Sequence, residues 1–323
     1  MLTRRSVLAR AAALLSAPWF APSAFAQAFP AKPIRIIVPF PPGGPADTAV
    51  RLSQPGMEKA LGQSVVVENV PGAAGGIGAQ RVKQSEPDGH TLLQAASPHT
   101  TNAAVKPGAN VNLLRDFEPI GQTGNSIYTL CASKASGVAT FAEMVARAKA
   151  KPGELKIGSV GNGSAHHLIA EMLKAAAAID LTHVPYRGEA PAIPDLIAGR
   201  IDLMFLTTAK PLIDDGRVVG LGHTGDGPWF NLANVKPLTE LGLKGFVVPG
   251  WNGLMAPKGT PPAAVAKLSQ ALSAALKPDA AVKGFNNMGF KPGTGTPGPM
   301  KAQIEDDMRL FTTVIRERNL KFD

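Results

Sequence analysis

Residues 36–48 read Ile36-Ile37-Val38-Pro39-Phe40-Pro41-Pro42-Gly43-Gly44-Pro45-Ala46-Asp47-Thr48, and the rest of the chain is organised around this stretch. Its β-branched start predicts a strand, the Pro/Gly elbow predicts a tight loop, and the polar pair at its end can open a helix. In an open α/β sheet such a loop lies beyond the carboxyl end of a strand, where ligands bind. Free backbone N–H groups at a helix start favour an anion. We therefore predict that this loop binds an anion, most plausibly a carboxylate.

The same order of strand, Gly-rich loop and helix recurs along the chain. A second such loop spans residues 69–78 and a third spans residues 161–164. Repeats of this kind indicate a parallel sheet with helices on its faces. We expect the first helix to kink or break at Gln54-Pro55-Gly56, because proline removes a helical N–H group. After residue 245 the chain reads as extended and broken by Pro and Gly, as in a crossing between domains. Two amphipathic helices follow, at 262–276 and about 299–317.

The length of the chain bears on the number of domains, and its first residues bear on export. A chain of 323 residues exceeds the usual size of one hydrophobic core, so two domains or one large domain are expected. Residues 1–26 read as a signal peptide cleaved near Ala26, with paired arginines at Arg4 and Arg5, an apolar run, and small residues at the cleavage site. The arginine pair is typical of a twin-arginine signal, and a Sec signal fits equally well. Either route exports the protein.

Charge and cysteine content narrow the function further. Removal of residues 1–26 lowers the formal charge from +9 to +6, and the remaining basic residues are scattered. Nucleic acid is therefore a weak candidate partner, whereas a small acidic ligand suits the charge. Cys131 is the only cysteine, so no intramolecular disulfide can form. It lies in an apolar run, which indicates a buried and inert thiol.

Several landmarks follow one another along the mature chain. They are Pro39-Phe40-Pro41-Pro42-Gly43-Gly44 with Asp47 and Arg51, Val66-Val67-Glu68-Asn69, Pro71-Gly72-Ala73-Ala74-Gly75-Gly76, Pro87-Asp88-Gly89-His90-Thr91-Leu92, Val184-Pro185-Tyr186-Arg187-Gly188, Ala198-Gly199-Arg200-Ile201-Asp202 and Ala256-Pro257-Lys258-Gly259-Thr260-Pro261. No single motif is specific, but the ordered set covers nearly the whole mature chain. It resembles the periplasmic solute-binding proteins of tripartite tricarboxylate transporters, the Bug or TctC-type family.

The resemblance implies an α/β fold of two domains, the periplasmic-binding-protein clamp or Venus flytrap, in which each domain is a mixed sheet flanked by helices. Residues 27–125 plus 250–323 would form the first domain, and residues 126–249 an inserted second domain. A carboxylate would lie between the domains, held by two loops of the first, here residues 40–47 and 72–76. The resemblance also implies a periplasmic binding protein, not an enzyme, without a cofactor or metal. It would act as a monomer that delivers its ligand to integral-membrane transporter subunits.

The candidate ligand-binding residues of the first domain lie in these two loops and at the end of a strand. Small residues let backbone N–H groups approach an anion closely, although a plain tight turn explains the same glycines. Asp47 suits an N-cap or a loop brace better than a ligand contact, since two carboxylates repel each other. The full set is Phe40, Pro41, Gly43, Gly44, Ala46, Asp47, Ala73, Ala74, Gly75, Ser97 and His99.

The candidates of the second domain centre on the third Gly-rich elbow, which would offer N–H groups and polar side chains to the far end of the ligand. Arg187 could pair with a second carboxylate or form a salt bridge inside its domain, and both alternatives stay open. His167 and Glu171 have helical spacing, but two residues without a third ligand are weak support for a metal site. The set is Gly161, Asn162, Gly163, Ser164, His166, Tyr186, Arg187 and Thr207.

One departure from the family pattern bears on the ligand. Many members have Met-Phe-Asp at the strand end where this chain has Met204-Phe205-Leu206, so an acidic group often near the ligand is missing. A ligand ammonium would lose its partner, which favours aliphatic di- or tricarboxylates or aromatic carboxylates over amino acids.

Other functions compete with ligand transport. A ligand-sensing partner of a signalling receptor has the same sequence features as a transport protein. A secreted hydrolase is disfavoured, because Ile157 stands where a G-x-S-x-G elbow around Ser159 needs its first glycine. A dinucleotide site at residues 72–78 is equally poor, since the glycine spacing is wrong for G-x-G-x-x-G.

Overall fold

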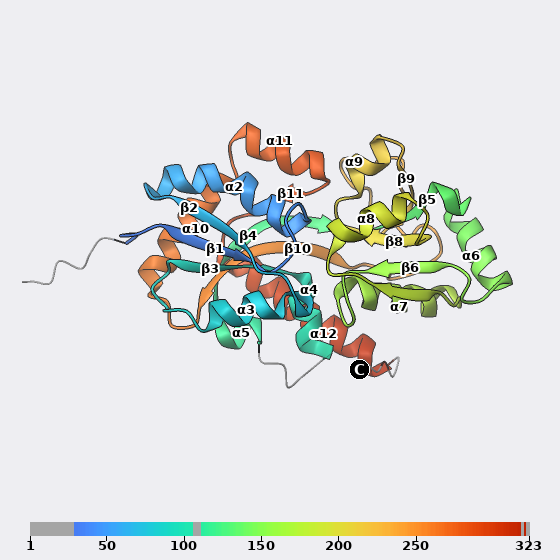
Figure 1. The fold of residues 1–323 in the computed structure, drawn as a ribbon, viewed down its shortest axis with the longest axis horizontal. Helices are drawn as coiled ribbons and strands as arrows, with labels where there is room; N and C mark the ends of the chain where they lie inside the picture. Colours follow the sequence, from blue (N-terminus) through green and yellow to red (C-terminus); the bar gives the residue numbers. More distant parts are fainter. Residues whose placement is uncertain (1–28, 106–110, 318–319, 321–323) are drawn as a thin grey trace, which may run out of the picture.

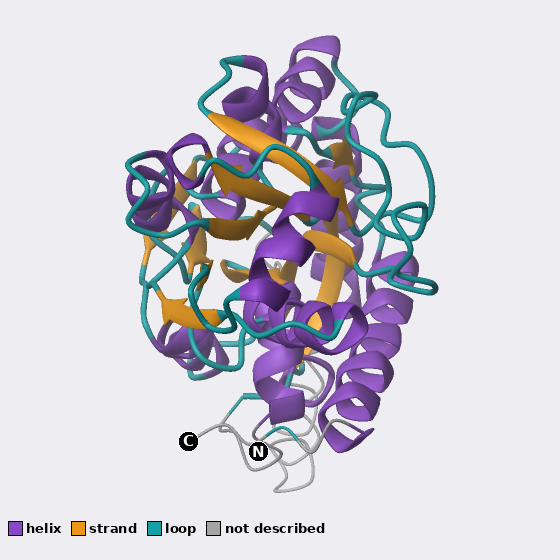
Figure 2. Cartoon of the chain, turned by 90° about the vertical axis from the view of Figure 1, so that its right-hand side faces the viewer, coloured by secondary structure: helices purple, strands orange, loops and turns teal. Residues whose placement is uncertain are grey.

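The computed structural model describes residues 29–105, 111–317 and 320. The predicted signal peptide, residues 1–26, lies outside this part of the chain. Two mixed sheets, each flanked by helices, form two halves that lie side by side along the long axis of the molecule (Figure 1). Figure 2, turned by 90°, shows the orange strands inside and the purple helices around them. The mixed sheets are those that the family resemblance implied, whereas the repeats alone had indicated parallel ones.

The first sheet has the strand order β11-β4-β10-β3-β1-β2. Strand β1 pairs in parallel with β2 and β3, and β10 runs antiparallel to β3 and β4. Its strands are β1 (Ile34–Val38), β2 (Val65–Asn69), β3 (Thr91–Ala96), β4 (Phe117–Ile127), β10 (Pro249–Pro257) and β11 (Lys291–Pro292), and its helices are α2 (Pro45–Leu61), η2 (Ala73–Gly75), α3 (Gly76–Lys83), α4 (Ser97–Val105), α5 (Leu113–Asp116), α10 (Pro262–Ala275), α11 (Asp279–Met288) and α12 (Pro297–Glu317).

The second sheet has the strand order β7-β6-β8-β5-β9. Strand β6 pairs in parallel with β7 and β8, and β5 runs antiparallel to β8 and β9. Its strands are β5 (Thr129–Ser133), β6 (Lys156–Ser159), β7 (Thr182–Pro185), β8 (Leu203–Leu206) and β9 (Val218–His223), and its helices are η3 (Lys134–Ser136), α6 (Phe141–Ala150), α7 (Ala165–Ala177), α8 (Glu189–Ile197) and α9 (Ala209–Asp214).

Both sheets are packed on two faces. Successive residues of a strand point to opposite faces, and accordingly Ile36 and Ile37 of β1 belong to two different hydrophobic clusters. The second sheet is likewise covered on both sides, with Leu130 in one cluster and Cys131 in the other. The thiol of Cys131 is free and fully buried, as the sequence predicted, and burial raises its pKa. None of the described helices is long and apolar enough to cross a bilayer.

The chain passes between the halves along two neighbouring strands. Strand β4 continues through Tyr128 into β5, and β10 returns beside it, with Ile127 opposite Pro249 in the ladder. The side chain of Thr224 links the two crossings, because its Oγ1 accepts from the N–H of Tyr128 (3.0 Å) and donates to the carbonyl of Val248 (2.5 Å). The extended segment expected after residue 245 thus forms β10, one of two adjacent crossing strands.

Helix α12 also spans both halves. Near its start Met300 and Ile304 pack in a cluster with residues of the first sheet. Further along, Phe311 is buried in the main cluster of the second half, and Met308 packs against it. The predicted domain division, which places all of residues 250–323 in the first domain, stays a prediction.

Of the kink or break predicted in the first helix, the break is wrong. Helix α2 runs without interruption from Pro45 to Leu61 and contains Pro55. Gly56 lies directly against α10, where a Cβ atom would come within 2.6 Å of the Cα of Ala275. Close packing of the two helices therefore outweighs the hydrogen bond that proline removes.

Candidate ligand-binding cleft

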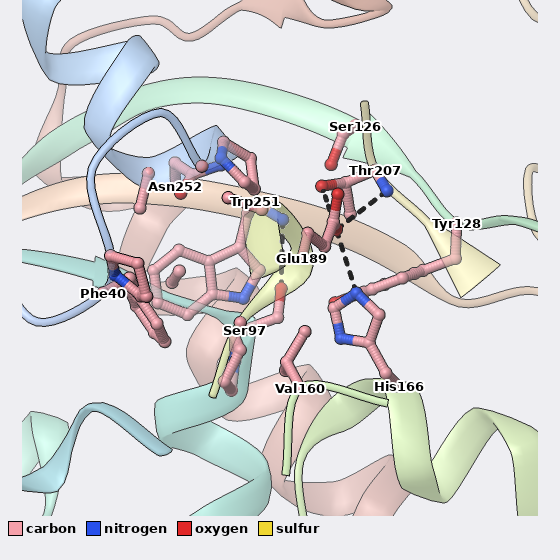
Figure 3. Close-up of a pocket in the computed structure, with 18 residues that line it drawn as sticks. Phe40, Ser97, Ser126, Tyr128, Val160, His166, Glu189, Thr207, Trp251 and Asn252 are labelled. Atoms are coloured by element: carbon pink, nitrogen blue, oxygen red, sulfur yellow. Dashed lines mark hydrogen bonds and ion pairs between the residues drawn. The ribbon is translucent and has the colours of Figure 1, made fainter. Parts of the chain in front are cut away.

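Two adjoining hollows lie between the halves. The inner cavity, drawn in Figure 3, is narrow, with a volume of about 50 Å³, and the wider outer groove measures about 940 Å³. Phe40 from the first half and Val160 from the second line both hollows, so one continues into the other. We use the names inner cavity and outer groove in this sense below.

The loop before α2 brings a helix N-terminus to the inner cavity. Gly44 is the N-cap in an extended conformation, without a side-chain cap, and Pro45 is the first helical residue. Among the described residues, no acceptor lies within hydrogen-bond reach of the backbone N–H groups of Gly44, Ala46 and Asp47. Gly44, Pro45 and Ala46 line the cavity. Unpaired N–H groups of this kind attract an anion.

Asp47 holds this loop in shape and does not line the cavity. Its Oδ2 accepts from the N–H of Gly43 (2.9 Å) and from Arg51 Nε (3.0 Å), and its Oδ1 accepts from Asn69 Nδ2 (3.0 Å). Asn69 Nδ2 also donates to the carbonyl of Phe40 (3.1 Å). Burial opposes the charge of Asp47, but the hydrogen bonds from Arg51, Gly43 and Asn69 outweigh it and lower the pKa. The position is that of the loop brace considered from the sequence.

The second loop lies along the outer groove. Gly72, Ala73 and Gly75 line that groove, whereas the side chain of Ala74 is outside the described part of the structure. His99 lies beneath the two loops and lines neither hollow: its ring meets the ring of Phe40 edge-on at 5.5 Å, and a Cβ atom at Gly75 would come within 2.7 Å of its Nε2. Burial lowers the pKa of His99 to about 4, so the ring is a neutral support at pH 7.

The third elbow satisfies most of its own backbone donors. The N–H of Gly161 donates to Ser159 Oγ (3.2 Å), that of Gly163 to His167 Nδ1 (3.1 Å), and that of Ser164 to the carbonyl of Gly161 (3.2 Å). Gly161 and Asn162 line the outer groove, and Gly163 and Ser164 line neither hollow. The expected offer of N–H groups from this elbow to a ligand is therefore wrong for these three residues.

Two further sequence candidates line the outer groove. The hydroxyl of Tyr186 donates to Asp195 Oδ2 (2.9 Å), and its pKa is raised to about 12, mainly by burial. The guanidinium of Arg187 is exposed, and no carboxylate of the described residues lies within ion-pair distance of it. The salt bridge considered for Arg187 is therefore absent from the described structure.

A buried glutamate in the cavity wall was missed by the sequence reading. Glu189, the first residue of α8, is 3% exposed. Its Oε1 accepts from His166 Nε2 (2.9 Å) and from both the N–H (2.9 Å) and Oγ1 (2.7 Å) of Thr207, and its Oε2 accepts from Thr208 Oγ1 (2.9 Å), as Figure 3 shows in part. Burial opposes its charge, but the bonds from His166 and Thr207 outweigh burial and lower its pKa.

Glu189 corrects the inference drawn from the Met204-Phe205-Leu206 segment. An acidic group does lie in the cavity wall, although Leu206 replaces the family's aspartate. In the sequence, an acid directly after Gly188 indicates only a favourable helix start, so nothing local pointed to the cavity. His166 and Thr207, which the sequence did select, line the cavity together with this residue.

The crossing strands supply the other residues that were missed. Ser126 of β4, Trp251 and Asn252 of β10, and Tyr128 between β4 and β5 all line the inner cavity. Ser97 joins them and accepts from the N–H of Trp251 (3.0 Å). Three polar atoms of the cavity lining are buried without a hydrogen-bond partner among the described residues, and they are Ser126 Oγ, His166 Nδ1 and Asn252 Oδ1. Such atoms mark the positions where a ligand's polar groups would bind.

Apart from Ala74, the sequence candidates thus divide into three groups. Gly43, Asp47, His99, Gly163 and Ser164 line neither hollow. The inner cavity is lined by Phe40, Pro41, Gly44, Ala46, Ser97, His166 and Thr207, and the outer groove by Phe40 again with Ala73, Gly75, Gly161, Asn162, Tyr186 and Arg187.

Catalytic and metal chemistry find little support. Among the described residues no group of three His, Cys, Asp or Glu side chains could hold a metal ion, and His167 Nε2 lies 3.9 Å from Glu171 Oε1. Ser159 Oγ does contact His183 Nε2 at 2.6 Å, but Ser159 is fully buried and lines neither hollow. The ring of His183 stacks on that of His167 at 3.7 Å, which makes the pair part of the packing behind the elbow.

Comparison with known proteins gives a consistent result along most of the chain. The family model described as the tripartite tricarboxylate transporter family receptor, TctC, matches residues 49–320. The protein BugT of Bordetella pertussis is 31% identical over 300 residues, which cover 92% of each chain. A UPF0065 protein from Pseudomonas sp. (strain P51), in the tcbD-tcbE intergenic region, is 34% identical over 297 residues, covering 91% of this chain and 88% of the relative.

Solved structures show the same fold, each with 30% sequence identity. The periplasmic binding protein BugD superposes with a TM-score of 0.85 over 91% of this chain and 99% of its own. MatC from Rhodopseudomonas palustris, with bound malate, gives 0.84 over 89% of this chain and all of its own. The R. palustris protein Rpa4515, with adipate, gives 0.85 over 89% and 97%.

Proposed function

Because the chain belongs to the TctC family of tripartite tricarboxylate transporter receptors, we propose that it is a periplasmic solute-binding protein that captures a small carboxylate in the inner cavity. It delivers this ligand, as a monomer, to integral-membrane transporter subunits. It is a binding protein and not an enzyme, so the captured anion leaves the site unchanged. Capture lets the ligand bridge the two halves, and the closed form is the one that the transporter recognises.

The observation that carries this proposal is the start of α2. The unpaired N–H groups of Gly44, Ala46 and Asp47 lie at a helix N-terminus whose loop lines the cavity. No lysine or arginine is among the residues that line the inner cavity, so backbone dipoles supply the positive potential there. The R. palustris neighbours with malate and adipate support a carboxylate as the ligand class. Aliphatic di- or tricarboxylates and aromatic carboxylates are the candidates.

The domain division supports the same mechanism. We place residues 27–125 plus 250–323 in the first domain and residues 126–249 in the second. The hinge then consists of the crossing strands β4 and β10, which also supply Ser126 and Trp251 to the cavity. A ligand that touches these strands and both loops would favour the closed arrangement over the open one.

A thermal-shift screen tests the proposal. The mature chain from residue 27 is mixed with mono-, di- and tricarboxylates, aliphatic and aromatic, and with uncharged sugars and amines as controls. Carboxylates that bind at 100 times their Kd should add about 2.7 kcal/mol of stability and raise the Tm. If no carboxylate raises the Tm, and the purified protein carries no bound carboxylate, capture of a carboxylate is the wrong function. Cell fractionation with an antibody against the chain checks the periplasmic location separately.

A further inference from the structure

We propose that the wall of the inner cavity opposite the α2 N-terminus is a subsite for an uncharged hydrogen-bond donor. It is built by Glu189, His166 and Thr207, and it selects ligands with one carboxylate and a hydroxyl group at the far end. This inference rests on the proposed function, the capture of a small carboxylate, and within that class it favours hydroxy-monocarboxylates over the di- and tricarboxylates named above. Figure 3 shows Glu189, His166 and Thr207 together, across the cavity from Phe40.

All the hydrogen bonds at the Glu189 carboxylate are donated to it by its neighbours. A carboxylate is an acceptor only, so the hydroxyl protons of Thr207 and Thr208 are committed to it (2.7 and 2.9 Å). The hydroxyl of Thr207 can then offer a ligand only its remaining lone pair. The side chains of Thr207 and Glu189 therefore offer acceptors, and not donors, to a ligand.

The imidazole of His166 contacts Glu189 through one of its two ring nitrogens. Its Nε2 lies 2.9 Å from Glu189 Oε1, which places the ring proton on Nε2. Its other ring nitrogen, Nδ1, is an acceptor in this tautomer, and it is buried without a partner among the described residues in a side chain that is only 4% exposed. Asn252 Oδ1 is a second unpartnered acceptor of the cavity lining, on the opposite half of the molecule. A donor on the ligand would satisfy atoms that the described protein leaves unpaired.

A charged group at the far end of the ligand, either a carboxylate or an ammonium, fits this wall poorly. A second carboxylate would lie beside the charge of Glu189, with no lysine or arginine in the cavity lining to compensate it. An ammonium group would bring three donors to a carboxylate that already accepts four hydrogen bonds, three at Oε1 and one at Oε2. A hydroxyl needs one acceptor and carries little desolvation cost. The geometry therefore fits a hydroxyl best.

Matched ligands test the subsite at pH 8 by calorimetry on the wild-type protein. Each of two ligand series holds one carboxylate constant and varies the group at the far end. The aliphatic series is butyrate, 4-hydroxybutyrate, succinate and 4-aminobutyrate. The aromatic series is benzoate, 4-hydroxybenzoate, terephthalate and 4-(aminomethyl)benzoate. In whichever series binds, the hydroxyl ligand should bind about tenfold or more tightly than the other three members. If the dicarboxylate or the amine binds most tightly, the subsite is assigned wrongly. If no carboxylate of any kind binds, the proposed function itself fails.

A variant shows whether Glu189 sets this preference. Glu189→Gln removes the charge and keeps an acceptor for His166 and Thr207, so the ratio of affinities for the dicarboxylate and the hydroxyl ligand should rise about tenfold. Asp195→Asn is the matched control, because this carboxylate pairs with Tyr186 and Arg200 away from the cavity, and its ratio should stay at the wild-type value. An unchanged ratio in folded Glu189→Gln would overturn the role of Glu189. Should that variant not fold, the wild-type ligand series decides the proposal alone.

Discussion

The indole Nε1 of Trp251 donates a 2.7 Å hydrogen bond to Oδ2 of Asp307, which ties the wall of the inner cavity to helix α12. Asp307 is 2% exposed and also accepts from Thr100 Oγ1 (3.2 Å) and Gln303 Nε2 (2.8 Å). The backbone N–H of Trp251 is fixed in turn by Ser97. An aromatic side chain held at both ends gives the cavity a preformed wall, and the group that holds it is titratable.

Asp307 should make stability depend on pH in an unusual direction. Burial raises the pKa of this carboxyl to about 6, despite three hydrogen bonds that act the other way. Because the folded-state pKa lies above the unfolded value near 4, the folded protein binds the extra proton between these two pH values. This group therefore contributes stability that is present at low pH and is lost as the pH rises through about 6. Asp307→Asn removes that contribution.

The buried histidines act in the opposite direction, so the two effects can be separated. Burial lowers the pKa of His99, His183 and His223 to about 4. The stability that these neutral rings contribute to the folded protein is lost as the pH falls from about 6.5. Urea unfolding between pH 7 and pH 4.5 should show a steeper loss for Asp307→Asn than for wild type, by up to about 1.4 kcal/mol per pH unit. Parallel pH profiles of the two proteins would mean that Asp307 keeps an ordinary pKa.

A side chain at Gly44 should block the anion site. Gly44→Val adds a branched side chain at the N-cap, in a backbone conformation that valine can adopt (φ −78°), and its bulk would occupy the approach to the free N–H groups. Affinity for carboxylates should fall by at least about tenfold, while the Tm without ligand changes little. Ala266→Val, on the exposed face of α10, is the control for the valine itself. Full carboxylate affinity in Gly44→Val would place the anion elsewhere.

The loop before α2 was the segment whose local structure was best predicted from the sequence, for a local reason. Strand, Pro/Gly elbow and helix start are encoded within residues 36–48, and they form β1, the loop and α2 in the structure. The brace role considered for Asp47 is likewise a short-range matter of capping geometry. Signals of this kind need no knowledge of the partner elements.

The features that were not predicted from the sequence depend on contacts between segments that are distant along the chain. Glu189 reaches the cavity only because α8 begins beside the end of β8, and Trp251 does so only because β10 lies between β3 and β4. The elbow at residues 161–164 had the right composition for an anion site, yet Ser159 and His167 take up its donors. Proline at position 55 predicted a break that packing of Gly56 on Ala275 overrode.

The brace beneath the anion loop should respond to a charge at position 69. Asn69→Asp replaces the amide that donates to Asp47 Oδ1 and the Phe40 carbonyl by a carboxylate. Two carboxylates would then share the site, so we expect a loss of about 1–3 kcal/mol at pH 7 that diminishes as the pH falls and one carboxyl is protonated. Asn69→Ala removes the donor without adding charge, and its stability loss should not depend on pH in this way. Equal pH profiles for the two variants, measured by urea unfolding, would exclude the repulsion.

Thr224 should prove to be the residue that fastens the two crossing strands to each other. It is fully buried, and its Oγ1 both accepts from the N–H of Tyr128 and donates to the carbonyl of Val248. Thr224→Val keeps the volume but leaves both backbone groups without this partner, so unfolding in urea should show a loss of about 2–4 kcal/mol. Thr224→Ser keeps the hydroxyl and loses one methyl group, and about 1 kcal/mol is expected for it. If the serine variant loses as much stability as the valine variant, the methyl packing of Thr224, and not its two hydrogen bonds, holds the crossing together.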